Sequence, residues 1–334
     1  MKKYELTDKT KVEYGVTLHR IRALVDIVRY GVKAGDLGGW IESEANLDQE
    51  HDAWVFDKAL VFDEAWVSGD ARVSGKALVY GKARVYGKAR VYDEAWVSGA
   101  ARVSGKALVY GKARVYDEAW VSDEALVFDE ALVYDEAWVF DKALVSGKAL
   151  VYGKARVFDE AWVSGDARVS DEAWVYGKAR VYDEARVYGK ARVYDEAWVY
   201  DEARVYDEAL VYGKARVYDE ARVYGKARVY DEARVYGKTR VYGKARVYDE
   251  ARVYKTAHVL TVGPIGSRDD TTTFFRVKFS DGFTISVCCG CFHGTVDEFR
   301  AKVKQTHGDD KHGKAYQLAA DLAEAQIELD VEAQ

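Results

Sequence analysis

The sequence contains few residues that interrupt regular structure. Its 334 residues include one proline, Pro264, and three cysteines, all between positions 288 and 291. A chain that is poor in proline and rich in Val, Tyr, Trp and Arg does not have the composition of a disordered protein, so we expect it to fold. Three cysteines so close together do not fit the disulfide framework of a small secreted protein, which needs pairs spread along the chain.

Long apolar segments are also missing. The sequence has no run of about 18 apolar residues, which a membrane-spanning helix needs, and residues 1–14 contain no apolar segment of the kind found in secretion signals. The formal net charge of -6 gives no overall attraction to nucleic acid or to anionic membranes, although local charge can differ from the total. We therefore expect a cytoplasmic protein without a membrane partner.

What the sequence does contain is one repeat of six residues. A valine stands at every sixth position from Val55 to Val253, which makes 34 consecutive hexads, and an alanine stands two residues before each valine except at Thr239. This alternation places Ala and Val on one face of a half-buried strand. A pair such as Gly-Lys or Asp-Glu follows, and we expect it to form a corner because Gly and Asp both tolerate turn conformations.

A hexad with a branched aliphatic residue and a small residue at fixed positions resembles the hexapeptide repeat of left-handed parallel β-helices, known from acyltransferases and γ-class carbonic anhydrases. The resemblance implies triangular, left-handed coils of three hexads with stacked Ala and Val inside. We therefore predict an all-β solenoid, a left-handed triangular parallel β-helix of about 11 to 12 coils, with a small α+β cap at its C-terminal end.

The repeat has recognisable limits. Ile41 and Leu47 keep the six-residue step, but Leu47 and Val55 are eight residues apart, so two extra residues loop out around 49–52. The pattern ends near Val259. Because open solenoid ends expose unpaired strand edges, both ends need caps. We therefore predict an N-terminal cap over 1–40, the β-helix over 41–259 and a C-terminal cap over 260–334.

The C-terminal cap shows signals for both strands and helices. Segments 273–279 and 283–287 predict a hairpin across the Asp-Gly turn at 280–282. A helix should begin after the N-cap Thr295 and end at His307 and Gly308, and a second helix should cover about 314–329.

Short motifs at both ends carry a second resemblance. The segments GGWIE at 38–42, GPIGSR at 263–268 and CGCF at 289–292 make the whole chain similar to a group of uncharacterised phage and prophage repeat proteins. This resemblance implies a phage-encoded protein in the host cytoplasm, and it brings no established activity.

The outward positions of the hexads are unusually aromatic and basic. The slot before each valine holds 18 Arg, 8 Trp and 8 Leu, and the slot after it holds 21 Tyr, 5 Phe and 8 Ser. Such side chains stabilise neighbouring coils by about 0.2 to 1 kcal/mol per pair. Large exposed aromatic surfaces also indicate a binding partner. Both interpretations remain open at this point.

Charge is unevenly distributed along the repeat. All nine charged residues from Val115 to Asp141 are acidic, whereas eleven Lys and Arg stand against six Asp and Glu from Gly213 to Arg252. The acidic segment is a candidate surface for imitating nucleic acid toward a protein, and it consists mainly of Asp117, Glu118, Asp123, Glu124, Asp129, Glu130, Asp135 and Glu136. The basic candidates, which combine cations with aromatic rings as single-strand binders do, are Arg216, Arg222, Arg228, Arg234, Arg240, Arg246 and Arg252 with Tyr218, Tyr224 and Tyr230.

Residues that would carry catalysis are sparse. Of six histidines, only His258 occupies a regular outward slot, and His51 lies in the small insertion. Neither the catalytic histidine of the acyltransferases nor the three zinc-binding histidines of the carbonic anhydrases is recognisable. Cys289, Cys291 and His293 are weak metal candidates, because thiolates and imidazole bind zinc but their spacing here is poor. We therefore predict no cofactor, no metal and no catalytic residue.

The leading hypothesis is a non-enzymatic phage-type repeat scaffold that presents Arg, Tyr and Trp ladders to a macromolecular partner. We expect a protein partner, with nucleic acid as an option at the basic half and self-association through the caps or the solenoid faces. The first alternative is inhibition of a host defence or nucleic-acid enzyme by charge mimicry or sequestration. The second is an acyltransferase-like enzyme, which rests on fold resemblance alone.

Overall fold

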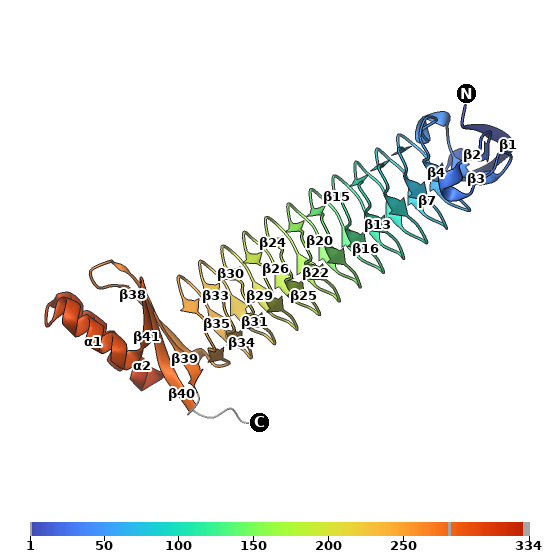
Figure 1. The fold of residues 1–334 in the computed structure, drawn as a ribbon. Helices are drawn as coiled ribbons and strands as arrows, with labels where there is room; N and C mark the ends of the chain where they lie inside the picture. Colours follow the sequence, from blue (N-terminus) through green and yellow to red (C-terminus); the bar gives the residue numbers. More distant parts are fainter. Residues whose placement is uncertain (1, 280–281, 330–334) are drawn as a thin grey trace. The chain divides into compact units, whose positions relative to one another are not determined.

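The computed structural model describes residues 2–279 and 282–329. It consists of two compact units, 1–177 and 178–334, and each is described by itself. The prediction of a parallel β-solenoid is confirmed in both, and the coils amount to about 12 turns. Figure 1 shows the short strands recurring along the coil in sequence order.

Unit 1 begins with an antiparallel arrangement that leads into the coil. Strand β1 (Tyr4–Glu13) pairs with β2 (Val16–Ala23), and β2 pairs with β3 (Leu37–Ile41). Strand β3 then pairs in parallel with β5 (Leu60–Val61), with Ile41 opposite Val61. Two short 3-10 helices, η1 (Val28–Tyr30) and η2 (Glu44–Asn46), complete this region. The N-terminal strands therefore extend one sheet of the solenoid.

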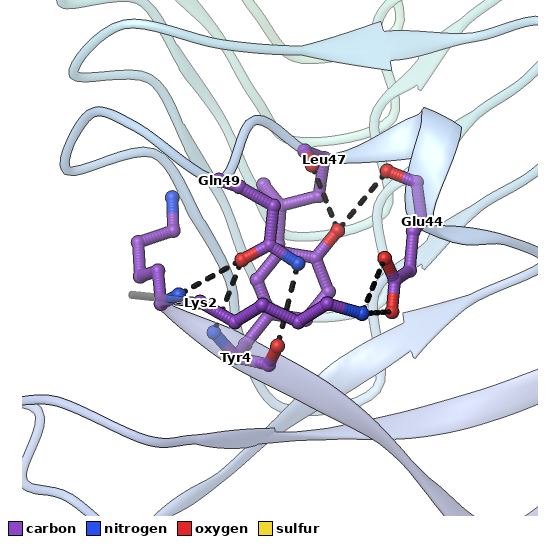
Figure 2. A network of polar contacts seen from close by, with 6 residues as sticks. Lys2, Tyr4, Glu44, Leu47 and Gln49 are labelled. Atoms are coloured by element: carbon purple, nitrogen blue, oxygen red, sulfur yellow. Dashed lines mark hydrogen bonds and ion pairs between the residues drawn. The ribbon is translucent and has the colours of Figure 1, made fainter.

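The two extra residues of the repeat help to anchor the N-terminus (Figure 2). Gln49 accepts hydrogen bonds from the backbone N–H groups of Lys3 and Tyr4 at 2.9 and 3.3 Å. The Tyr4 hydroxyl donates to the Leu47 carbonyl at 2.7 Å, and the Lys2 amine pairs with Glu44 at 2.7 Å. The Lys3 amine donates to two backbone carbonyls, and burial lowers its pKa to about 8. The insertion that sequence analysis placed around 49–52 thus clamps β1 to the first coil.

The coils have three sides, named here faces A, B and C, and each strand is two residues long. In unit 1, face A consists of β4 (Trp54–Val55), β7 (Arg72–Val73), β10 (Arg90–Val91), β13 (Leu108–Val109), β16 (Leu126–Val127), β19 (Leu144–Val145) and β22 (Trp162–Val163). Face B consists of β5, β8 (Leu78–Val79), β11 (Trp96–Val97), β14 (Arg114–Val115), β17 (Leu132–Val133), β20 (Leu150–Val151) and β23 (Arg168–Val169). Face C consists of β6 (Trp66–Val67), β9 (Arg84–Val85), β12 (Arg102–Val103), β15 (Trp120–Val121), β18 (Trp138–Val139), β21 (Arg156–Val157) and β24 (Trp174–Val175).

Unit 2 has the same three-sided coil. Its face A consists of β25 (Arg180–Val181), β28 (Trp198–Val199), β31 (Arg216–Val217), β34 (Arg234–Val235) and β37 (Arg252–Val253). Its face B consists of β26 (Arg186–Val187), β29 (Arg204–Val205), β32 (Arg222–Val223) and β35 (Arg240–Val241). Its face C consists of β27 (Arg192–Val193), β30 (Leu210–Val211), β33 (Arg228–Val229) and β36 (Arg246–Val247). Neighbouring strands on a face pair in parallel, as Arg228 does with Arg246 and Val229 with Val247.

The interior consists of the repeated alanines and valines, as predicted. Both residue types are 0% exposed in nearly every hexad. The corners also follow the prediction, because both Asp93 and Gly111 have positive φ, at 59° and 69°. Gly111 donates its N–H to the Asp93 carboxylate one coil away at 3.3 Å. The corner pairs therefore link successive coils through side chains as well as through backbone.

The C-terminal part of unit 2 is larger than the predicted hairpin. After η3 (Thr256–His258), a four-stranded antiparallel sheet forms from β38 (Val259–Ile265), β39 (Asp270–Phe279), β40 (Gly282–Cys289) and β41 (Phe292–Thr295). The predicted hairpin is its central pair, β39 and β40, while residues 280 and 281 of the predicted turn lie outside the described residues. The outer strands were missed because β38 is mostly apolar and contains a Gly-Pro pair instead of a regular alternation, and β41 is only four residues long.

Two helices pack on this sheet. Helix α1 (Val296–His307) has the predicted N-cap, since Thr295 and Glu298 form a capping box, and Gly308 ends it. Helix α2 (Lys311–Gln326) starts and ends three residues earlier than predicted, because the Asp310 side chain caps it by accepting from the N–H groups of His312 and Gly313. Phe299 and Tyr316 join a buried core with the sheet. Within the described residues, no helix combines the length and apolarity needed to span a membrane.

Candidate anion-binding groove

The aromatic ladders are closed stacks. On face B of unit 2, the rings of Tyr188, Tyr206 and Tyr224 stack with centroids 4.9 Å apart and nearly parallel planes. Burial raises the pKa of the Tyr188 and Tyr206 hydroxyls. Because each ring face inside a stack is covered by the next ring, the ladders present edges and hydroxyls. The rings inside a ladder therefore have no open face on which a base could stack.

The structure distributes the basic candidates over three faces of unit 2. Arg216, Arg234 and Arg252 lie on face A with Tyr218, Arg222 and Arg240 lie on face B with Tyr224, and Arg228 and Arg246 lie on face C with Tyr230. They do not form one continuous surface. The coil instead aligns residues that are 18 positions apart, and this spacing decides which charges meet.

One edge of unit 2 gathers cations from two kinds of position. The corner between faces B and C contributes Lys190, Glu208, Lys226 and Lys244, and the adjoining outward slots of face C contribute Arg192, Leu210, Arg228 and Arg246. A hollow of about 390 Å³ is lined by six of these residues, namely Lys190, Arg192, Glu208, Leu210, Lys226 and Arg228. We call the whole row of eight residues the cationic groove. It holds six cations and one carboxylate.

Backbone hydrogen bonds between coils fix the positions of these cations. The N–H of Lys226 donates to the Gly243 carbonyl at 2.7 Å, and the N–H of Arg228 donates to the Ala245 carbonyl at 2.9 Å. These bonds place Lys226 beside Lys244 and Arg228 beside Arg246. Lys226 also lies 3.6 Å from Glu208 of the preceding coil. The groove is thus built on rigid ladders.

The cationic groove ends in a second hollow, the end pocket, of about 240 Å³. Its walls are Lys226, Arg228, Lys244 and Arg246 from the coil and Asp270, Thr271, Thr273, Cys288 and Gly290 from the C-terminal sheet. The Arg246 guanidinium donates to the Gly290 carbonyl at 3.2 Å, and its backbone N–H donates to the Thr273 hydroxyl at 3.1 Å. The sheet therefore holds Arg246 in place.

Four cations surround the end pocket and one carboxylate opposes them. Lys244 pairs with Asp270 at 2.9 Å, and this contact lowers the pKa of the Asp270 carboxyl. Burial raises the pKa of the nearby Cys288 thiol, which favours its neutral form. An arrangement of Lys, Arg and hydroxyl donors can hold an anion by charge-assisted hydrogen bonds.

The acidic candidates of unit 1 are also divided among three corners. Asp129 and Glu130 follow face A. Asp117, Glu118, Asp135 and Glu136 follow face B, and Asp123 and Glu124 follow face C. Three of the four glutamates lie near lysines of adjacent coils, in the pairs Lys106–Glu124 at 2.6 Å, Lys112–Glu130 at 3.7 Å and Lys154–Glu136 at 3.8 Å. The acidic block of the sequence is thus dispersed and partly neutralised.

The metal candidates point in different directions. Cys289 packs on the helix side of the sheet, Cys291 is exposed at the turn, and His293 contacts the ring of Tyr248. The part of the chain that the structure describes contains no group of three or more His, Cys, Asp or Glu residues that could hold a metal ion. The prediction that His258 occupies an outward slot is wrong. His258 is 0% exposed and its ring packs edge-on against Tyr254.

Five residues of the end pocket were not among the predicted site residues: Lys226, Lys244, Asp270, Thr271 and Thr273. The signal for the two lysines was present, since each stands two residues before an arginine of face C and the pairs repeat after 18 residues. The pattern is not visible in the charge of consecutive residues, because the lysines that align are 18 positions apart. The three residues of β39 gave no signal, because their contact with the coil depends on how the sheet packs within unit 2.

Comparison with known proteins gives one family match. The family described as the YdcK beta-solenoid repeat matches residues 227–243, which contain β33, β34 and β35 of unit 2. Comparison with curated proteins gives no match. The coils and this match together make the chain a β-solenoid repeat protein.

Proposed function

We propose that the chain is a non-enzymatic β-solenoid scaffold that binds single-stranded nucleic acid along the cationic groove of unit 2. The observation that supports this most directly is the row of Lys and Arg side chains brought together at one edge. A polymer with one phosphate per nucleotide fits cations that recur from coil to coil. Because the tyrosine faces are covered, the phosphate backbone rather than the bases would be recognised.

The phage setting and the host cytoplasm belong to this proposal and rest on the resemblance of the two ends. Inhibition by charge mimicry receives less support, because lysines of adjacent coils lie close to three of the four glutamates in the acidic segment. An acyltransferase-like activity rests only on the resemblance of the repeat. An acidic protein surface is the competing partner for the same groove.

Nucleic-acid binding is tested by fluorescence anisotropy of the full chain with a labelled single strand at several salt concentrations. With about four phosphate contacts, the logarithm of the binding constant should fall with the logarithm of salt concentration at a slope of about -3. Replacing Lys226→Glu and Arg228→Glu together should weaken binding at least about ten-fold, since two adjacent groove cations become anions.

The matched control is Arg186→Glu with Arg204→Glu. These two arginines lie on face B, pair with each other in register and change the net charge by the same amount. We expect this control to bind nearly as well as the unaltered chain. Equal loss in both double variants, binding that does not respond to salt, or equal binding of polyglutamate would contradict the proposal.

A further inference from the structure

The cationic groove has a definite end. Its residues recur every 18 positions, and the next step after Lys244 and Arg246 falls on Val262 and Pro264, which belong to β38 of the sheet. Residues of β39 and β40 close the hollow at this point. The row of groove residues therefore stops at the end pocket.

The end pocket is smaller than the preceding hollow and is partly walled by the C-terminal sheet. The two hollows share Lys226 and Arg228, and each is lined by four cations and one carboxylate; their volumes are about 390 Å³ and about 240 Å³. In the end pocket this charge lines the smaller of the two spaces. Thr271 adds a half-buried hydroxyl, and Arg246 is already oriented by Gly290. Fixed donors bind more tightly because less side-chain entropy is lost.

We propose that the end pocket recognises the terminal phosphate monoester of a nucleic-acid strand, an inference that rests on the proposed function of the groove. A monoester carries a charge of about -1.5 to -2 at neutral pH, whereas an internal diester carries a single negative charge. It also has three terminal oxygens that accept hydrogen bonds from Lys244, Arg246 and Thr271. The pocket thus favours strand ends over internal positions.

The test compares oligonucleotides of one sequence that carry a 5′-phosphate, a 3′-phosphate or hydroxyls at both ends. At low salt, we expect at least one phosphate-ended strand to bind the full chain about ten-fold more tightly than the hydroxyl-ended strand. The preferred end then gives the polarity of the strand in the groove. Equal affinity for all three overturns the end-recognition proposal while the groove proposal stands, and failure of all three to bind overturns both.

Variants of the pocket provide the second arm. Arg246→Gln should remove the preference for a phosphate end, and Arg204→Gln on face B should keep it. Asp270→Asn should increase affinity for the phosphate-ended strand several-fold, because it removes the carboxylate that opposes the anion. The Asp270→Asn variant therefore tests the pocket even if Arg246→Gln does not fold. A preference that survives Arg246→Gln, or an unchanged affinity in Asp270→Asn, contradicts the proposal.

Discussion

A single residue breaks the alanine ladder of the interior. Thr239 takes the place of alanine before β35 and is 0% exposed, like Ala221 one coil earlier on the same face. Its hydroxyl has no hydrogen-bond partner among the described residues. A buried hydroxyl without a partner costs about 1 to 3 kcal/mol of desolvation. Thr239 is therefore a local weakness of unit 2.

Replacing Thr239→Ala should stabilise the protein by about 1 kcal/mol, since the desolvation cost outweighs the loss of one buried methyl group. Urea unfolding followed by circular dichroism measures the change. The reciprocal variant, Ala221→Thr, should destabilise the same ladder by a similar or larger amount. A loss of stability in Thr239→Ala would mean that packing of the Thr239 methyl group stabilises the fold by more than the buried hydroxyl costs.

Corners connect the elements of the solenoid, and they explain why the pairs Gly-Lys and Asp-Glu recur. An Asp at one corner accepts a hydrogen bond from the Gly N–H one coil later, as in Asp135 with Gly153 at 3.1 Å. The residues after them place Glu and Lys side by side, as in Glu136 and Lys154. Alternating the two pairs along a corner thus provides both a hydrogen bond and a charge pair. The lysines of the groove belong to the same system.

Corner glycines should differ in how well they tolerate a side chain, depending on whether the backbone of the next coil lies close to the added Cβ. Gly105 has φ +63° and an added Cβ would lie 2.6 Å from the Asp123 nitrogen, whereas Gly243 has φ +65° with nothing within 4 Å. Gly243→Ala should cost only the left-handed backbone strain of about 1 kcal/mol. Gly105→Ala should cost at least about twice as much, because its Cβ also meets the next coil. Equal losses in thermal unfolding would show that the corner relaxes.

The elements with a regular period could be predicted from the sequence, and those defined by tertiary contact could not. The Ala and Val positions, the corners and the N-cap Thr295 each depend on local residues, and the structure confirms them. The outer strands β38 and β41 depend on pairing with the central hairpin. The groove depends on alignment over 18 residues, and the pocket additionally on the docking of β39. Of the predicted basic residues, only Arg228 and Arg246 therefore line the end pocket.

At the scale of the whole molecule, the tyrosine ladders link stability to pH in both units. Burial, followed by the neighbouring tyrosines, raises the pKa of Tyr134 in unit 1 and of Tyr182 in unit 2 to about 12, from an ordinary value of 10.0. The folded chain thus retains protons that the unfolded chain loses. Stability should be unaffected by these groups below pH 10 and should fall as the pH rises from about 10 to about 12.

The ladders also contain phenylalanines, which suggests a direct test of this effect. Phe140 and Phe158 stack at 4.9 Å in unit 1, so a ladder accepts rings without hydroxyls. Replacing Tyr182, Tyr200 and Tyr218 by Phe should keep the face A stack of unit 2 and remove three groups that ionise. We expect alkaline unfolding of the variant to begin at a higher pH than that of the unaltered chain, in tyrosinate absorbance and circular dichroism recorded together. If tyrosinate instead forms at its ordinary pH while the circular dichroism stays native, the stacked rings do not protect their hydroxyls and the ladders do not couple stability to pH.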